Sequence, residues 1–201
     1  MTFSIGEAFL PAKLTAPPMT DEEFEALCSE HPDLFFEVTA EGELIVMPPA
    51  NPIAGGRQRK VATQLGNWSD ARTDGYVTDA ATGFVLPNGA RRAPDAAWTQ
   101  MARIRAMDPA QLEGAWHLCP DFVIEIRSGS DRVRALREKM QEWIDNGAQL
   151  AWLLDPETRS VEIYRPNASV QICTSLETLV GEGPVAGFVL DLAPVWNPLG
   201  Q

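Results

Sequence analysis

The sequence predicts a single domain of the α/β or α+β class over residues 1–201. Apolar runs with strand-like alternation are separated by segments whose apolar residues recur at helical spacing. The chain has no internal repeat, low-complexity tract or long linker, and its 45% hydrophobic content is enough to build a packed core. Together these observations favour one domain of sheet and helices.

The N-terminal third predicts a helix, a hairpin and a second helix. In segment 20–30, Thr20 is followed three residues later by Glu23, which is a capping-box pattern at a helix start. Segment 34–49 alternates around an Ala-Glu-Gly step and predicts a β-hairpin, while segment 51–56 predicts a loop and 57–72 a helix. Both helices carry their apolar residues on one side: Phe24, Leu27 and Cys28 in the first, and Val61, Ala62, Leu65 and Trp68 in the second.

The middle of the chain predicts short strands and one long connection. Segment 79–101 predicts two short strands around the turn-rich residues 87–94, and segment 101–119 predicts a connection with a short helix at 108–114. Segment 121–127 predicts a strand, in which alternate residues share a face. One face therefore carries Asp121, Val123, Glu125 and Arg127, and the other carries Phe122, Ile124 and Ile126 toward a core.

The clearest helix lies within segment 128–148. Ser128 or Ser130 could cap its start, and Asn146-Gly147 could end it. Lys139 falls at the edge of the apolar stripe, beside Trp143. Segment 149–166 then predicts a strand, a turn and a strand, and 187–192 a last strand. The stripe of the helix is formed by Val133, Leu136, Met140, Trp143 and Ile144.

Charge is unevenly distributed along the chain. The net charge is −12, which argues against a nucleic-acid binder because phosphate contacts need Lys and Arg. Between Arg57 and Lys139, however, lie 13 of the 16 basic residues and only 10 of the 28 acids. Two interpretations stay open: solvated helix faces, or a locally positive groove on an acidic protein.

Cysteines and hydropathy indicate a cytoplasmic chain. The three cysteines, Cys28, Cys119 and Cys173, show no metal-binding spacing and are expected to be reduced thiols. Residues 1–10 have neither a basic start nor a long apolar core, so we expect no signal peptide. No apolar run approaches the roughly 20 residues that span a membrane, so no membrane partner is expected.

Acidic residues sit where an apolar strand would bury them. A buried carboxylate is unfavourable unless it is paired, hydrogen-bonded or bound to a metal. If a neighbouring strand carries Asp95, its carboxylate could lie beside that of Glu125. Two such oxygen ligands with a backbone carbonyl and waters suit Mg²⁺ or Mn²⁺, and Arg127 or Lys139 could stabilise developing negative charge.

Three stretches, taken in order, carry a resemblance to a known family. They read APDAAW (93–98), CPDFVIEIRSGSD (119–131) and REKMQEWIDNGAQLAWLLDPETRSVEIYRP (137–166). The chain resembles the Uma-two family of restriction-endonuclease-like proteins, in the PD-(D/E)XK superfamily, from about Thr20 to Trp196. The resemblance implies a restriction-endonuclease-like mixed β-sheet flanked by helices, with a metal site where the central strands bend.

The same resemblance assigns the site residues. It implies that Asp95 and Glu125 are metal ligands, with the Ile126 carbonyl as a third. The superfamily lysine normally lies two positions after the Glu, where this chain has Arg127; the family's lysine on the following helix matches Lys139. Glu37 matches a family acid that assists through water or a second metal. Gln58 stands where many members carry a His, so water activation would depend on the metal, Glu37 or Lys139.

Each residue also has a structural interpretation. Asp95 could cap a turn, Glu125 could form an ion pair with Arg127 or Lys139, and Lys139 could lie over Trp143. Arg127 is expected to be a salt-bridge partner, and Asp121 a hydrogen-bonding residue at the strand entry. His31 and His117 are given no catalytic role.

The leading hypothesis is a Mg²⁺- or Mn²⁺-dependent endodeoxyribonuclease, acting on DNA through Asp95, Glu125 and Lys139, with Glu37 auxiliary. A homodimer is expected because nucleases that cut both strands are often paired. The alternative is a catalytically silent nuclease fold that serves as an interaction or regulatory module. A hydrolase acting on another phosphate ester is a third option.

Overall fold

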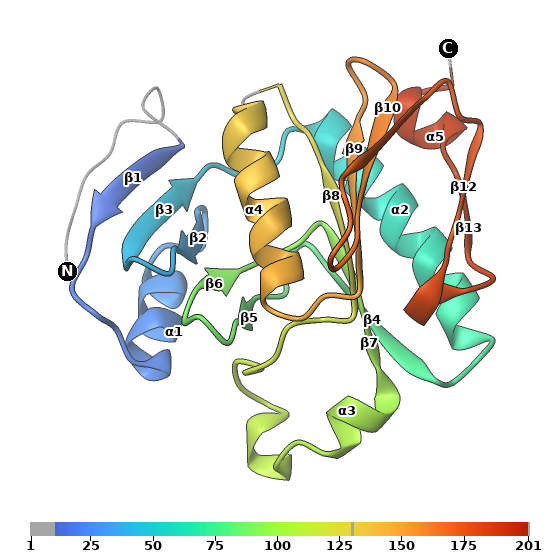
Figure 1. The fold of residues 1–201 in the computed structure, drawn as a ribbon. Helices are drawn as coiled ribbons and strands as arrows, with labels where there is room; N and C mark the ends of the chain where they lie inside the picture. Colours follow the sequence, from blue (N-terminus) through green and yellow to red (C-terminus); the bar gives the residue numbers. More distant parts are fainter. Residues whose placement is uncertain (1–10, 130, 201) are drawn as a thin grey trace.

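Two larger β-sheets and a small hairpin form the fold, with helices on both faces of the central sheet (Figure 1). The computed structural model describes residues 11–129 and 131–200. The central sheet has the order β11 (Gln171–Thr174), β10 (Ser160–Tyr164), β9 (Leu150–Asp155), β8 (Phe122–Ile126), β7 (Ala96–Gln100) and β4 (Gly75–Asp79). The N-terminal sheet has the order β1 (Ala12–Thr15), β3 (Glu43–Met47), β2 (Phe35–Val38), β6 (Arg91–Arg92) and β5 (Phe84–Val85). The hairpin consists of β12 (Thr178–Val180) and β13 (Val189–Asp191).

The central sheet is mixed, as expected. Strands β8 and β9 are parallel, and the other pairs in the sheet are antiparallel. Parallel neighbours need a crossover, and helix α4 (Val133–Asp145) provides it between β8 and β9. The prediction of a mixed sheet flanked by helices is therefore confirmed.

Helices cover both faces of the central sheet. Helix α2 (Pro52–Asp70) packs Val61 and Leu65 into one core with the Phe122, Ile124, Ile126 face of β8. Helix α4 packs Met140 and Trp143 into a second core with Val123 on the opposite face. Alternation along β8 is as predicted, but its acid-bearing face is also buried, because α4 lies over it (Figure 1).

The N-terminal elements follow their local sequence signals. Helix α1 (Asp21–Glu30) starts with the predicted capping box, in which the Glu23 amide donates to Thr20 Oγ1 and the Thr20 amide donates to the Glu23 carboxylate. Strands β2 and β3 form the predicted antiparallel hairpin. Leu27 of α1 packs with the buried side of these strands in a third core. A single domain over residues 1–201 stays a prediction.

Two helix starts differ from the sequence prediction. Helix α2 begins at Pro52, so the prediction of a loop at 51–56 is wrong. Asn51 caps the helix, because its Oδ1 accepts hydrogen bonds from the Ile53 and Ala54 amides. Proline suits the first helical position that follows. Helix α4 has Arg132 at its N-cap without a side-chain hydrogen bond, so Ser128 does not cap it, and Ser130 lies outside the described residues. Its predicted end at Asn146-Gly147 is confirmed, with Gly147 at φ +116°.

The middle segment holds more elements than its sequence indicated. Three strands, β5, β6 and β7, replace the two expected there, and the N-terminal sheet receives two of them. Helix α3 (Met101–Arg105) was not expected. Where the sequence predicted a short helix at 108–114, the structure has only the 3-10 turn η2 (Pro109–Gln111). The C-terminal part adds the turn η3 (Gly183–Val185) and helix α5 (Ala193–Trp196).

Gly75 allows strand β4 to approach the Trp98 ring. A Cβ built on Gly75 would lie 2.0 Å from Trp98 Cε2, and Trp98 is held by a 3.0 Å hydrogen bond from Nε1 to Ser69 Oγ. We therefore expect Gly75→Ala to lower the free energy of unfolding by about 1–3 kcal/mol in urea denaturation. Gly66→Ala is the matched control: no atom lies within 4 Å of its Cβ, so it should raise stability by about 0.5–1 kcal/mol. Equal effects would contradict this packing.

Two further predictions concern the cysteines and the hydropathy of the chain. Cys28, Cys119 and Cys173 are all unpaired. Burial raises the pKa of the Cys119 thiol to about 12, so it stays protonated at neutral pH. Within residues 11–129 and 131–200, no helix is long and apolar enough to cross a bilayer. A cytoplasmic location stays a prediction.

Candidate active site

Asp95 lies where the chain passes from the N-terminal sheet into the central sheet. Strand β6 ends at Arg92, and strand β7 begins at Ala96. The register pairs Ala96 with Ile124 in antiparallel strands, so one further step places Asp95 opposite Glu125. The Asp95 carboxylate accepts two hydrogen bonds, from Gln58 Nε2 to Oδ1 at 2.7 Å and from the Ile126 amide to Oδ2 at 2.6 Å. Helix α2 and strand β8 together orient this acid.

Glu125 lies on the face of β8 that α4 covers, and only 5% of its surface is exposed. Its Oε1 lies 2.8 Å from Lys139 Nζ and accepts a 3.0 Å hydrogen bond from Trp143 Nε1. The two donors come from one helix, four residues apart, so they lie on the same helix face. The sequence-predicted pairing of this acid with the helix lysine is therefore present.

Lys139 occupies the centre of the cluster. Its Nζ lies 2.7 Å from Glu37 Oε1 and 2.8 Å from Glu125 Oε1, and it donates to the Ala93 carbonyl at 2.9 Å. Three donor hydrogens thus meet three acceptors, which is the full capacity of an ammonium group. The side chain is 14% exposed, so it does not extend into solvent.

Glu37 enters the cluster from strand β2 of the N-terminal sheet. Besides Lys139, it accepts from the Ala93 amide at 3.1 Å and from Arg92 Nη1 at 3.1 Å. Arg92 also donates from Nε to Glu142 of α4 at 2.5 Å. Glu125, Lys139, Glu37, Arg92 and Glu142 thus form a chain of alternating charges that connects α4 to both sheets, and each of these five side chains has an opposite charge beside it.

Burial and neighbouring charge separate the pKa values of the acids. Burial raises the pKa of Glu125 to about 7, with a further rise from the charges of Asp95 and Glu37 and an opposing effect of Lys139. Burial also raises the pKa of Asp95. For Glu37, burial is outweighed by the charges of Lys139 and Arg92, so its pKa lies below the ordinary value. The pKa of Lys139 is raised, because the two glutamates outweigh its burial.

The donor set of Asp95 and Glu125 fits a small divalent cation. Both described contacts of Glu125 use Oε1, and each hydrogen-bonded oxygen of Asp95 keeps a second lone pair. Mg²⁺ is commonly held by one or two carboxylates and several waters, so two acids suffice. In the described part of the chain, no three His, Cys, Asp or Glu side chains form a metal-binding group. The Ile126 carbonyl as a third ligand stays a prediction.

Two residues of the predicted strand lie outside this cluster. Arg127 pairs with Asp155 at 2.9 Å and with Glu157 at 2.8 Å, which agrees with its expected role as a salt-bridge partner. Asp121, at the strand entry, accepts from the Gln100 amide and from Gln149 Nε2, both at 2.8 Å. Neither side chain reaches the acids near the end of β8.

Trp143, Arg92 and Glu142 belong to the cluster but were not identified from the sequence. Trp143 was recognised as part of an apolar stripe, where its indole nitrogen gave no separate signal. Arg92 lies within a run of bases, and its two acidic partners are 55 and 50 residues away in the chain. Such pairings have no local sequence pattern.

Ion pairs account for most of the basic segment. Beyond the cluster, Arg103 pairs with the buried Asp121, and Arg91 pairs with Asp21. Along helix α4, Arg134 pairs with Glu138 and Arg137 with the buried Glu162. These acids neutralise much of the local positive charge, and the positive groove stays a prediction.

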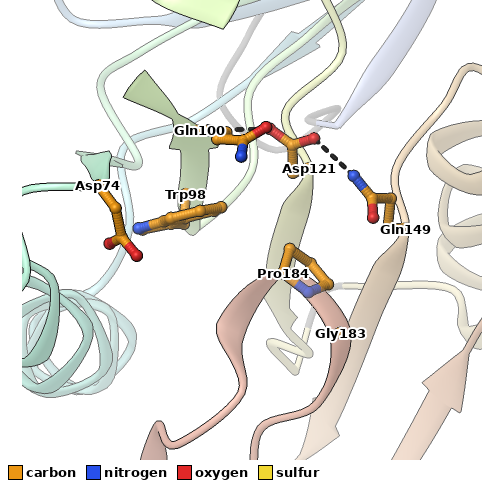
Figure 2. A pocket seen from close by; sticks show the side chains of 7 residues that line it. All are labelled: Asp74, Trp98, Gln100, Asp121, Gln149, Gly183 and Pro184. Carbon is orange, nitrogen blue, oxygen red and sulfur yellow. Dashed lines mark hydrogen bonds between the residues drawn. The ribbon is translucent and has the colours of Figure 1, made fainter. Parts of the chain in front are cut away.

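A hollow of about 260 Å³ lies at the other end of β8 (Figure 2). Figure 2 shows Asp121 bonded to Gln149 across its rim, with Trp98 and Pro184 on the sides. The hollow is lined by Asp74, Trp98, Gln100, Asp121, Gln149, Gly183 and Pro184, none of which belongs to the Asp95–Glu125 cluster. The Asp121 carboxylate is fully engaged, since Arg103 also contacts it at 2.9 Å.

The mixed sheet and its flanking helices form a nuclease-like fold. The family model described as "Putative restriction endonuclease", Uma2, matches residues 21–193, and the chain belongs to this family. A solved structure with the same fold is the crystal structure of a putative nuclease belonging to DUF820 from Anabaena variabilis ATCC 29413. It superposes with a TM-score of 0.72 at 21% identity and covers 89% of this chain and 98% of that one. Among curated proteins, none matches the chain.

Proposed function

We propose that the chain is a Mg²⁺- or Mn²⁺-dependent endonuclease that hydrolyses phosphodiester bonds of DNA. The observation that carries the proposal is the 2.8 Å contact between Lys139 and Glu125, an acid that the strand register places opposite Asp95. The family resemblance implied Asp95 and Glu125 as metal ligands with Lys139 on the following helix, and the contact of Lys139 with Glu125 supports that arrangement. Family membership and the fold support the nuclease class.

Each residue has a distinct task under this proposal. Asp95 and Glu125 would hold the divalent cation, which supplies Lewis-acid polarisation of the phosphate and a more acidic bound water. Lys139 places a fixed positive charge beside these acids, where negative charge develops on the phosphate. Glu37 is auxiliary: with a lowered pKa and contacts to Lys139, Arg92 and Ala93, it is better suited to hold Lys139 than to remove a proton.

Gln58 is the residue that takes the place of a histidine base. Its amide cannot accept a proton at neutral pH, and it already donates to Asp95 Oδ1 at 2.7 Å. Its task under the proposal is to orient Asp95. Pairing of two copies in a homodimer, so that both strands of a duplex are cut, stays a prediction.

Plasmid nicking tests the proposed function. With Mg²⁺ or Mn²⁺, we expect wild-type protein to nick supercoiled plasmid, and Asp95→Asn or Glu125→Gln to reduce the rate at least about 100-fold. Glu138→Gln is the matched control, because Glu138 neighbours Lys139 in sequence but is exposed and pairs with Arg134. Equal nicking by all proteins would rule out the assignment.

Mn²⁺ calorimetry separates the nuclease from the catalytically silent alternative. The nuclease proposal requires binding that Asp95→Asn and Glu125→Gln each remove. Absence of binding to wild-type protein, together with absence of nicking, would favour an interaction or regulatory module built on this fold.

A further inference from the structure

The carboxylate of Glu125 is held from one side only. Trp143 Nε1 donates to Oε1 at 3.0 Å, and Lys139 Nζ lies 2.8 Å from the same oxygen. Both described contacts therefore share one oxygen, and Oε2 is left as the oxygen available to a ligand. Two donors on a single oxygen restrict rotation of the carboxylate about its last bond.

Trp143 is a rigid donor. The side chain is completely buried, and its ring packs edge-on against Phe84 with the ring centroids 6.5 Å apart. Its backbone carbonyl accepts from Cys119 Sγ at 3.4 Å, within the same core. A buried indole N–H needs an acceptor, and here that acceptor is the proposed metal ligand. Lys139, in contrast, is shared among three acceptors.

We propose that Trp143 is a positioning residue, which fixes the Glu125 carboxylate so that Oε1 faces Lys139 and Oε2 is presented to the cation. The cation part of this inference rests on the proposed function. Hydrogen bonds that orient a liganding carboxylate typically change metal affinity by about 10–100-fold when they are removed. Trp143 thus has two roles: its ring packs in the core, and its indole N–H raises the affinity of Glu125 for the cation.

Matched tryptophan variants separate positioning from packing. Trp143→Phe removes the indole N–H together with part of the ring, whereas Trp152→Phe removes the same atoms from the other core. Trp152 is 1% exposed and packs on Phe122 and Phe188. In Mn²⁺ calorimetry we expect Trp143→Phe to weaken binding roughly 10-fold or more, and Trp152→Phe to leave it unchanged at a comparable loss of melting temperature. Equal affinities in the two variants would overturn the proposal.

A metal-free measurement needs no tryptophan variant. In protein with ¹⁵N-labelled indoles at pH 8, where Glu125 is charged, we expect Glu125→Gln to shift the Trp143 Nε1–H resonance, because a charged acceptor is replaced by a neutral one. The Trp98 Nε1–H resonance, whose acceptor is Ser69, should not move. An unmoved Trp143 resonance would overturn the positioning role. If wild-type protein binds no Mn²⁺, the proposed function fails, and this NMR result still decides whether Trp143 holds Glu125.

Discussion

Lys139→Met is expected to lower the free energy of unfolding by about 3–5 kcal/mol at pH 7. The substitution removes the shared partner of Glu37 and Glu125, which are 3% and 5% exposed. Two buried carboxylates would then lack their nearest positive charge, and the Ala93 carbonyl would lose a donor. Breaking a buried pair from one side leaves an uncompensated charge, and that accounts for most of the expected loss.

Urea denaturation measures this loss, and a surface pair on the same helix is the control. Arg134 and Glu138 form an ion pair with 92% and 65% exposed side chains, so Arg134→Met should change stability by no more than about 1 kcal/mol. Adding Glu125→Gln to Lys139→Met should recover part of the loss, because without Lys139 the folded protein must either bury a charged Glu125 or bind a proton there at pH 7, and the amide needs neither. Similar losses for Lys139→Met and Arg134→Met would show that the cluster is not a buried network.

Glu125→Gln is expected to stabilise the metal-free protein increasingly as the pH rises. The pKa of Glu125 rises from 4.5 to about 7 on folding, mainly through burial. Between these values the unfolded chain has lost the proton and the folded chain keeps it, so wild-type stability falls as pH rises through the window. A pKa shift of this size lowers the free energy of unfolding of the wild-type protein by about 3 kcal/mol at pH 8. The Gln variant does not lose this stability.

Unfolding in urea and EDTA at pH 5, 6, 7 and 8 tests the sign and the window. Asp155→Asn is the control, since burial of Asp155 is outweighed by Arg127 and its pKa is lowered from 3.8. The stability that ionised Asp155 contributes is present above pH 3.8 and is lost only in more acidic solution. The free energy of unfolding of Asp155→Asn should therefore differ from that of wild type by a constant amount from pH 5 to 8. A Glu125→Gln difference that is also flat would contradict the raised pKa.

Elements with strong local signals were predictable from the sequence. The capping box at Thr20, the hairpin around Gly42 and the apolar stripe of α4 depend on residues close together in the chain, and all three are present. The placement of Lys139 beside Trp143 followed from the same helical spacing. These features need only periodicity and capping chemistry.

Elements defined by distant partners were not predictable. Strand β6 has only two residues, Arg91 and Arg92, and exists because Val38 and Phe84 lie on either side of it. The start of α2 was missed because Gly55 and Gly56 favoured a loop, although Asn51 and Pro52 form a good helix start. At the site, Asp95, Glu125, Lys139 and Glu37 were expected together from the family resemblance. The Arg92 and Trp143 contacts depend on how separate elements pack, which no short pattern encodes.

The link between strands β6 and β7 is short, and it limits the distance between the two sheets. Ala93 is bonded through its amide to Glu37 and through its carbonyl to Lys139, and two residues later the chain reaches Asp95. An insertion of a single residue between Arg92 and Asp95 would either break these backbone bonds or displace Asp95 from its place opposite Glu125. Natural length variation in related chains should therefore avoid the two residues Ala93 and Pro94 and accumulate in the connection after α3 instead.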